Sequence, residues 1–493
     1  MRKKIKIFWV NAYLAKKLMK KRIYSVFLAG VILSGMSVGS VAAVQADEER
    51  VGYMQMEGDR YYACEPVDQE YVKVGFIFSS DEDNEFTASH YEAAKKMQET
   101  MGLSDDQVVF VWDDPNANAC EDLFLDCNIV FGDYVAHDEV MAYWSDENSP
   151  YGSGVFNIFD WDTQFCSIGT EAIYVRNDLS GSSDKWPGFD RSEAGEGILT
   201  LAPMHNFNFA TYEARYVSGV VAGIKLNEMI ETGEITEDEA KLGFVGAFPV
   251  TEVISGFSAF YLGARSVCPS VTMRVKYDYS WASCDKDRET AEELINEGCV
   301  LLSHHTGTTT VAEVCEDAGV YFVGCNKSML DIAPNYALTS VVFDWNVYYT
   351  YAVDSIINGY MIDTDWCAGY AQDAVGITEL NESALPEGTA EQVREVEEAI
   401  KNGTLHVFDT STWTVNGETI ETCPTADAYG EGRFSFVTGY YTTDFISDGY
   451  FHESEIASYP EFSFIIDGID ADEATETYTG YSHPHPYGII EFE

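Results

Sequence analysis

Positive charge is scarce in this sequence of 493 residues, which has 29 lysines and arginines against 82 aspartates and glutamates. Nine of the basic residues lie within the first 22 positions, and no acidic residue occurs before Asp47. From Asp47 onward the formal net charge is therefore -62. Such an acidic surface repels phosphate backbones and anionic lipid head groups, so we exclude nucleic-acid binding.

Several compact motifs of enzymes and cofactor-binding proteins are also missing. The sequence contains no GxSxG nucleophile elbow, no GxGxxG or Walker A loop and no EF-hand-like calcium loop. The high acidity is typical of solubility in a salty or acidic medium, with specific calcium binding as the alternative. Paired carboxylates are too abundant here to be informative, so a secreted acidic hydrolase stays an alternative function.

The eleven cysteines form no CxxC pair and have no zinc-like spacing to histidine. Their odd number leaves at least one free thiol, and their scatter favours buried thiols over disulfides. His304 and His305 are adjacent, so their side chains would point in different directions, which argues against a metal site there. We expect no metal and no cofactor.

The N-terminus has the pattern of an export signal. Lys20, Lys21 and Arg22 precede an apolar run that extends from Ile23 to about Ser40, and small or apolar residues at 44–46 fit a cleavage site. We therefore expect residues 1–46 to be a signal peptide and the mature protein to be exported. A membrane anchor is the less favoured alternative, because the apolar run is short and is interrupted by glycine and serine.

Strands and helices alternate along most of the chain, which is typical of α/β proteins with parallel sheets. Predicted strands are 71–79, 108–112, 128–132, 198–201, 242–245, 271–277, 300–303, 321–324 and 337–342. Predicted helices are 86–102, 253–266, 288–297, 311–317, 345–358 and 390–402. Between about 146 and 197 the alternation fails, and we interpret this stretch as an insertion. An acidic extension follows residue 380, with strand-like pieces at 434–438 and 462–466.

The stretch from Asn206 to Ala247 shows the repeating unit most clearly. Its first part has apolar residues at helical spacing and predicts an amphipathic helix, and 242–245 predicts a short buried strand. Gly219 and Gly223 lie four residues apart and would let a neighbouring backbone approach closely. Arg215 lies near Glu213, and we expect the two to form a buried ion pair at a hinge.

Ligands of open α/β sheets bind beyond the carboxyl ends of the strands, so the segments that follow strands are the candidate site. These segments offer aromatic rings and hydrogen-bonding groups, which together suit a flat heteroaromatic ligand. The candidate residues are Asp83, Phe86, Thr87, His90, Trp281, His305, Thr306 and Asn326. Core packing is the alternative role for Phe86 and Trp281.

Five segments of the chain resemble the basic membrane protein family, whose members are extracytoplasmic substrate-binding proteins of ABC importers. The segments are NFATYEARYVSGVVAG, LGFVGAFPVTEVISGFSAFYLGARSVCPSVTMRVKY, SWASCD, LLSHHTGTTTVAEVCEDAGVYFVGCNKSM and APNYALTSVVFDWNVYY. The resemblance covers roughly residues 71–380 apart from the insertion. The family includes purine nucleoside-binding lipoproteins and a branch that binds purine nucleobases.

The resemblance implies a type I periplasmic-binding-protein fold, an α/β fold with two Rossmann-like lobes of parallel sheet joined by three crossovers. The implied first lobe is 71–203 with 340–360, and the second lobe is 204–339 with 361–380. Residues 47–70 would be a lead-in, and 381–493 the C-terminal extension. The lobes would close on a purine-like ligand and deliver it to a membrane ABC permease, without catalysis.

The resemblance also implies roles for particular residues. Phe86 matches the aromatic residue that stacks on the base, while His90, Trp281, His305 and the loop 325–329 match pocket-lining segments. Trp366 lies in a segment similar to the last return between the lobes. We expect these residues to line a ligand site.

The sequence departs from the family pattern at four places. Gly307 and Ser328 stand where members often carry an aspartate, and Phe343 stands near the position of a ribose-binding lysine. These departures favour a nucleobase or another flat heterocycle over a ribonucleoside. Residues 33–36 have no lipobox cysteine, so we expect a cell-surface or extracellular protein without assuming a lipid anchor. A sensory receptor subunit without transport is a further alternative.

Overall fold

The computed structural model describes residues 66–141, 163–168, 204–423 and 444–473, with short gaps at 135, 138–139, 361, 364 and 456–457. It also describes the backbone of short strands at 56–57, 60–61, 434–435 and 439–440. The chain divides into a unit Met1–Met54 and a unit Gln55–Glu493, and everything described belongs to the second unit. The expected signal peptide lies outside the described residues. No helix in the described ranges has the length and apolar character needed to cross a membrane.

The first sheet has six strands, all parallel, in the order β13-β7-β6-β5-β3-β4. Its strands are β3 (Val74–Ile77), β4 (Val108–Val111), β5 (Ile129–Gly132), β6 (Gln164–Ser167), β7 (Met204–Phe209) and β13 (Asp365–Ala368). The helices of this part are α2 (Glu85–Thr100), α3 (Cys120–Asp126) and α10 (Asn346–Asn358). β3 and β5 are buried along their whole length, as expected for parallel strands covered on both faces.

The second sheet has seven strands in the order β14-β12-β11-β10-β8-β9-β19, and only β14 is antiparallel to its neighbour. Its strands are β8 (Lys241–Gly246), β9 (Thr272–Tyr277), β10 (Leu301–His305), β11 (Tyr321–Cys325), β12 (Ala337–Phe343), β14 (Val375–Ile377) and β19 (Ile469–Ala471). Its helices are α6 (Thr211–Thr232), α7 (Thr251–Val267), α8 (Cys284–Asn296) and α9 (Thr310–Ala318), with α11 (Thr389–Lys401) against α6.

The chain passes between the two sheets three times. It leaves the first sheet after Phe209, returns to α10 after Phe343, and leaves again between Ala368 and Val375. The predicted fold of two parallel α/β lobes joined by three crossovers is therefore confirmed. The strand pairing places 204–209 and 365–368 in the first lobe and 337–343 in the second. The predicted limits at 203, 339 and 360 therefore all come too early, because each crossover follows a strand.

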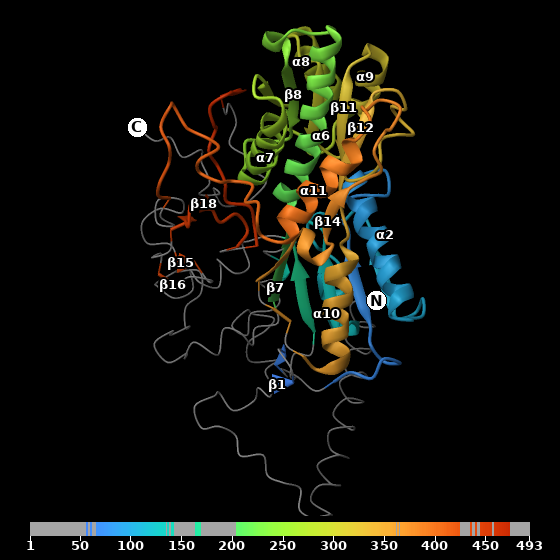
Figure 1. Cartoon of the computed structure of the whole chain (residues 1–493). Helices are drawn as coiled ribbons and strands as arrows, with labels where there is room; N and C mark the ends of the chain where they lie inside the picture. The colour runs from blue at the N-terminus through green and yellow to red at the C-terminus, as the bar shows by residue number, and fades with distance from the viewer. Residues whose placement is uncertain are drawn as a thin grey trace, which may run out of the picture. The chain divides into compact units, whose positions relative to one another are not determined.

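α6 and α7 pack against each other along the second lobe, and they lie side by side in Figure 1. A Cβ atom at Gly219 would lie 2.0 Å from the Phe260 carbonyl oxygen, and one at Gly223 would lie 2.4 Å from the Ala264 carbonyl oxygen. On α7, a Cβ at Gly263 would lie 2.0 Å from the Tyr216 carbonyl oxygen. Glycine is therefore required at these three positions, as the spacing of Gly219 and Gly223 predicts.

Several elements of the first lobe differ from the predicted ones. β6 lies inside the expected insertion and pairs with both β5 and β7, whereas the predicted strand 198–201 falls outside the described residues. β7 occupies the start of the segment that predicts a helix, and α6 begins only at Thr211. The reason is the alternation of Asn and Phe along β7, which has the period of a strand and buries Phe207 and Phe209.

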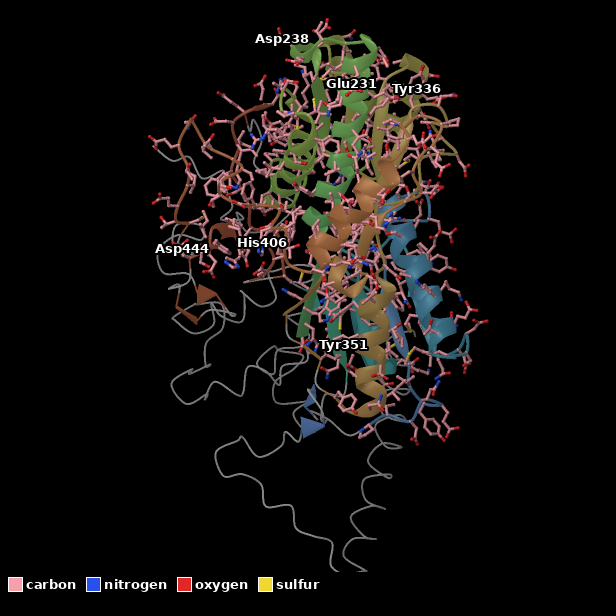
Figure 2. The ribbon with its side chains drawn as sticks, viewed as in Figure 1. Glu231, Asp238, Tyr336, Tyr351, His406 and Asp444 are labelled. Carbon is pink, nitrogen blue, oxygen red and sulfur yellow. The ribbon has the colours of Figure 1, made fainter. Side chains whose placement is uncertain are left out.

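The C-terminal extension is attached to the second lobe. β19 pairs in parallel with β9 and so adds the last strand to the second sheet. Asp444, labelled in Figure 2, accepts hydrogen bonds from the backbone N–H groups of Cys423 (2.5 Å) and Ile446 (3.0 Å). Phe408 stacks on Phe462 with ring centroids 4.0 Å apart. The strand-like piece expected at 462–466 lies outside any strand.

Eight of the described cysteines are free thiols, which confirms the expectation of thiols over disulfides for them: Cys120, Cys127, Cys166, Cys268, Cys284, Cys299, Cys315 and Cys325. All of these except Cys284 are buried. Cys64 lies outside the described residues.

Candidate functional site

Loops from the two lobes meet at the start of α2. The Glu85 backbone N–H donates a hydrogen bond to the Gly307 carbonyl oxygen at 3.3 Å, and Gly307 in turn donates to the Trp281 carbonyl oxygen at 2.7 Å. The Lys327 Nζ atom lies 3.2 Å from Glu85 Oε1. The segments after β3, β9, β10 and β11 therefore converge, as expected for the carboxyl ends of parallel strands.

Asn84 fixes the start of α2. Its side-chain oxygen accepts hydrogen bonds from the backbone N–H groups of Phe86 and Thr87, both at 3.1 Å, which satisfies two donors of the first turn. A Cβ atom at Gly307 would lie 3.3 Å from the Asn84 side-chain amide. A side chain at residue 307 would therefore press against the cap of α2.

Glu85 is a buried carboxyl group, with 3% of the residue exposed. Burial raises its pKa, and the nearby Lys327 ammonium opposes this effect. Apart from the Lys327 ammonium, no residue in the described ranges donates a hydrogen bond to either carboxyl oxygen. Glu85 was not among the predicted site residues, because acidic side chains are common throughout the chain.

Phe86 and His90 contact each other on one face of α2. Their ring centroids are 4.6 Å apart in an edge-on arrangement, and Phe86 is half-buried. His90 is fully buried, stacks on Trp345 at 4.0 Å and contacts the Tyr349 hydroxyl through Nδ1 at 2.5 Å. Burial lowers the pKa of His90 well below its usual value, so the ring is neutral. His90 thus packs within the first lobe and supports Phe86.

Thr87 and Asp83 differ in their surroundings. The buried Thr87 hydroxyl donates to Asp133 Oδ2 at 2.9 Å, and Asp133 Oδ1 also accepts from the Ser79 backbone N–H at 2.8 Å. Burial raises the pKa of Asp133 to about 6. Asp83 is exposed, and its backbone N–H contacts the Asp81 side chain at 3.0 Å. Thr87 therefore braces the loop after β5, whereas Asp83 lies on the surface.

In the second lobe, Trp281 and His305 lie next to each other. Their ring centroids are 6.2 Å apart, and Trp281 also lies 5.4 Å from the Phe248 ring. His305 Nε2 is 3.6 Å from a carboxylate oxygen of Glu252. Burial lowers the pKa of His305, and Glu252 acts in the opposite direction.

Thr306 belongs to a buried polar cluster. Its hydroxyl donates to Asp287 Oδ2 at 3.2 Å, and Thr308 donates to the same oxygen. Asp278 lies beside Asp287. Burial raises the pKa of Asp278 most, and its hydrogen bond with Asp287 raises this pKa further. Burial also raises the pKa of Asp287. Burial and proximity therefore disfavour the simultaneous ionisation of the two carboxyl groups.

Asn326 follows β11 and adopts a left-handed backbone with φ of 68°. Asparagine tolerates this region better than most residues, which fits the sharp turn after the strand. Its side-chain oxygen is 3.6 Å from the Cys325 sulfur.

Arg215 does not form the ion pair expected with Glu213. It is fully buried, and its Nη2 donates to the Cys325 sulfur at 3.1 Å. Glu213 instead accepts a hydrogen bond from the Tyr370 backbone N–H at 2.7 Å, on the last crossover. Residues two apart on a helix face different directions, so the pairing was wrong for geometric reasons.

Trp366 lies on β13 and packs within the first lobe. Its ring is 4.9 Å from that of Tyr348 and 6.0 Å from that of Tyr351, which is labelled on α10 in Figure 2. It also lies 5.6 Å from Phe209. These contacts do not bring Trp366 to the group formed by Glu85, Gly307 and Lys327. In the described ranges, no group of three or more His, Cys, Asp or Glu could hold a metal ion.

The chain was compared with known proteins and structures. Residues 202–411 match the Bmp family, described as ABC transporter substrate-binding protein PnrA-like. A purine-binding protein of Brucella abortus (strain 2308) is 30% identical over 233 residues, which cover 46% of this chain and 63% of that protein. A Haloferax volcanii protein, provisionally named an ABC transporter glucose-binding protein, is 30% identical over 217 residues, which cover 44% and 52%. The chain thus spans between half and two thirds of these relatives.

A solved solute-binding protein of an ABC transporter system from Aeropyrum pernix K1 aligns with a TM-score of 0.50 and 13% identity. The alignment covers 68% of this chain and 93% of that chain, and it shows a shared fold. Two α/β lobes with three crossovers define the type I periplasmic-binding-protein class. Within that class, residues 202–411 match the model of the Bmp family, in agreement with the resemblance seen in the sequence.

Proposed function

We propose that this protein is an exported solute-binding protein of an ABC importer, and that it binds a purine nucleobase, nucleoside or similar flat heterocycle between its lobes. The observation that carries the proposal is the convergence of loops from both lobes around Glu85, Gly307 and Lys327. The match of residues 202–411 to the Bmp family supports the same function. The name of the Brucella relative supports a purine ligand.

The ligand would stack on aromatic rings from opposite lobes. Phe86 and Trp281 are both half-buried and flank the Glu85–Gly307–Trp281 hydrogen bonds. Thr306 and Asn326 would supply polar groups at the strand ends, while Thr87 and His90 hold Phe86 and its loop in place. Lobe closure would exclude water and retain the ligand for an ABC permease. The protein would bind and release its ligand without changing it.

The test is a thermal-shift screen of nucleobases, nucleosides and sugars on the chain from Asp47, followed by calorimetry. Phe86→Ala and Trp281→Ala should each weaken binding by about ten- to a hundredfold, since stacking on one base contributes about 1–3 kcal/mol. Tyr71→Ala is the matched control, because Tyr71 is 67% exposed on the surface. Failure of every purine and related heterocycle to raise the melting temperature would refute the proposal.

A sugar is the second candidate ligand, because of the name of the Haloferax relative. Sugars also stack on aromatic rings, and their hydroxyl groups donate hydrogen bonds to carboxylates. A melting temperature that rises with glucose and not with any heterocycle would establish this second candidate.

A further inference from the structure

Glu85 differs from Glu453, another buried glutamate of the described ranges. Glu453 accepts hydrogen bonds from the Ser255 hydroxyl and from the backbone N–H groups of Glu461 and Phe462. Glu85 has the Lys327 ammonium as its partner, 3.2 Å from Oε1, and no other residue of the described ranges donates a hydrogen bond to its carboxyl group. Buried carboxylates are normally hydrogen-bonded, because burial without partners is costly.

The helix itself does not explain this burial. An acidic residue in the first turn interacts favourably with a helix N-terminus, but it does so at the surface as well. Asn84 already caps α2 by accepting two backbone N–H groups. The Lys327 side chain is 50% exposed and comes from the other lobe, so the ion pair exists only while the lobes are together.

The surroundings of Glu85 call for hydrogen-bond donors. Its pKa is raised partly by the charge of Asp287, so a second carboxyl group lies near enough to be felt. The adjacent Gly307 presents a carbonyl oxygen, which already accepts from the Glu85 backbone. Two carboxyl groups and one ammonium favour a neutral or cationic group with N–H donors and disfavour an anionic group.

We propose that Glu85 determines the specificity of the site by accepting two N–H groups from one edge of a planar ligand that stacks on Phe86. This inference rests on the proposed function. An ionised carboxylate accepts hydrogen bonds and cannot donate them. A guanine-type edge offers a ring N–H beside an exocyclic amine, so both donors match the two oxygens. An adenine-type edge offers one donor and one acceptor, and the acceptor would face a carboxylate oxygen.

The discrimination should be large, since a bidentate charged pair typically separates a matched from a mismatched base by ten- to about a hundredfold. Inosine, which keeps the ring N–H and lacks the exocyclic amine, should bind with intermediate affinity. A ligand that carries a phosphate near this edge should bind more weakly than the corresponding nucleoside.

Isothermal titration calorimetry with guanosine, inosine, adenosine and glucose tests the inference on the chain from Asp47. The wild type should prefer guanosine to adenosine by at least tenfold. Glu85→Gln converts one acceptor into a donor, which matches the adenine edge. The affinity for guanosine should therefore fall at least tenfold, and the variant should prefer adenosine to guanosine. Glu82→Gln is the matched control: it removes the same charge from an exposed position in the same loop.

Melting curves without ligand show whether each variant is folded. If Glu85→Gln does not fold, Glu85→Asp keeps the charge with a shorter reach and should weaken guanosine binding while retaining the preference over adenosine. Equal affinities of the wild type for guanosine and adenosine, or an unchanged ratio in Glu85→Gln, would overturn the role of Glu85 alone. No binding of any purine by the wild type would overturn the proposed function, and this inference with it.

Discussion

Substitution of Glu453 by glutamine should make the stability of the protein less dependent on pH. Glu453 is 1% exposed and attaches the C-terminal extension to α7 through Ser255. Its second oxygen accepts the backbone N–H groups of Glu461 and Phe462, both at 2.8 Å. Glutamine has nearly the same shape: its carbonyl can accept the two N–H groups, and its amide can donate to Ser255.

The magnitude follows from the proton held by the folded protein. Burial raises the pKa of Glu453 from 4.5 to about 7, and the three hydrogen bonds act against this effect. Between these values the folded protein keeps a proton that the unfolded chain has lost. The stability due to this proton is complete below pH 4.5 and is lost as the pH rises past 7. The loss amounts to about 3 kcal/mol, at about 1.4 kcal/mol for each tenfold change in proton affinity.

Thermal unfolding of the wild type and Glu453→Gln at pH 4.5, 6 and 8 measures this effect. The two proteins should melt together at pH 4.5, and the variant should melt higher at pH 8 by about 6 °C. The comparison is needed because buried histidines such as His137, whose pKa burial lowers to about 4, change stability in the opposite sense. A difference in melting temperature that stays constant from pH 4.5 to 8 would refute the reasoning.

Two further predictions concern helix packing and lobe closure. Gly219→Ala forces α6 and α7 apart, and a cost of about 2–3 kcal/mol outweighs a gain of about 1 kcal/mol in helix propensity, so the melting temperature should fall. In Gly376→Ala, the added Cβ atom would have no heavy atom within 4 Å, so the melting temperature should stay unchanged. Equal melting temperatures of the two variants would contradict the packing argument. Lys327→Met leaves the Glu85 carboxylate unpaired, so X-ray scattering at pH 8 should give a larger radius of gyration than for the wild type. At pH 4, where Glu85 is protonated, the two should agree, and agreement at both values would count against closure by this ion pair.

Five of the seven strands of the second sheet could be predicted from the sequence, whereas β14 and β19 could not. Its buried strands are short apolar runs between helices with regular spacing, and strands such as β8 and β10 fall within one or two residues of their predicted limits. Local patterns suffice there because each strand is covered on both faces. The glycines of α6 also carried a correct prediction of close packing, since only a backbone approach requires them.

The first lobe was predicted less well, because its strands depend on partners far away in the sequence. β6 lies between stretches rich in Gly, Ser and Asp, and it acquires its strand conformation by pairing with β5 and β7. β13 is a four-residue strand, and pairing with β7 defines it. Tertiary pairing of this kind leaves little trace in local composition.

The candidate site was predicted as a set of loops and not as a set of contacts. The segments that follow β3, β9, β10 and β11 do meet, as the rule for strand ends predicts. Glu85 escaped notice because burial alone distinguishes it from the many exposed carboxylates. The pairing of Arg215 with Cys325 was also hidden, because the two residues lie 110 positions apart.

The position of β19 has a practical consequence for recombinant work. The family match ends at residue 411, but the last strand of the second sheet is formed by 469–471. A fragment trimmed to the family boundary would expose the hydrogen-bonding groups of β9 along an open edge, which is a template for self-association. It would also uncover the surface of α7 that Glu453 now covers. The extension is thus a structural part of the second lobe, and a recombinant protein should retain it through residue 473.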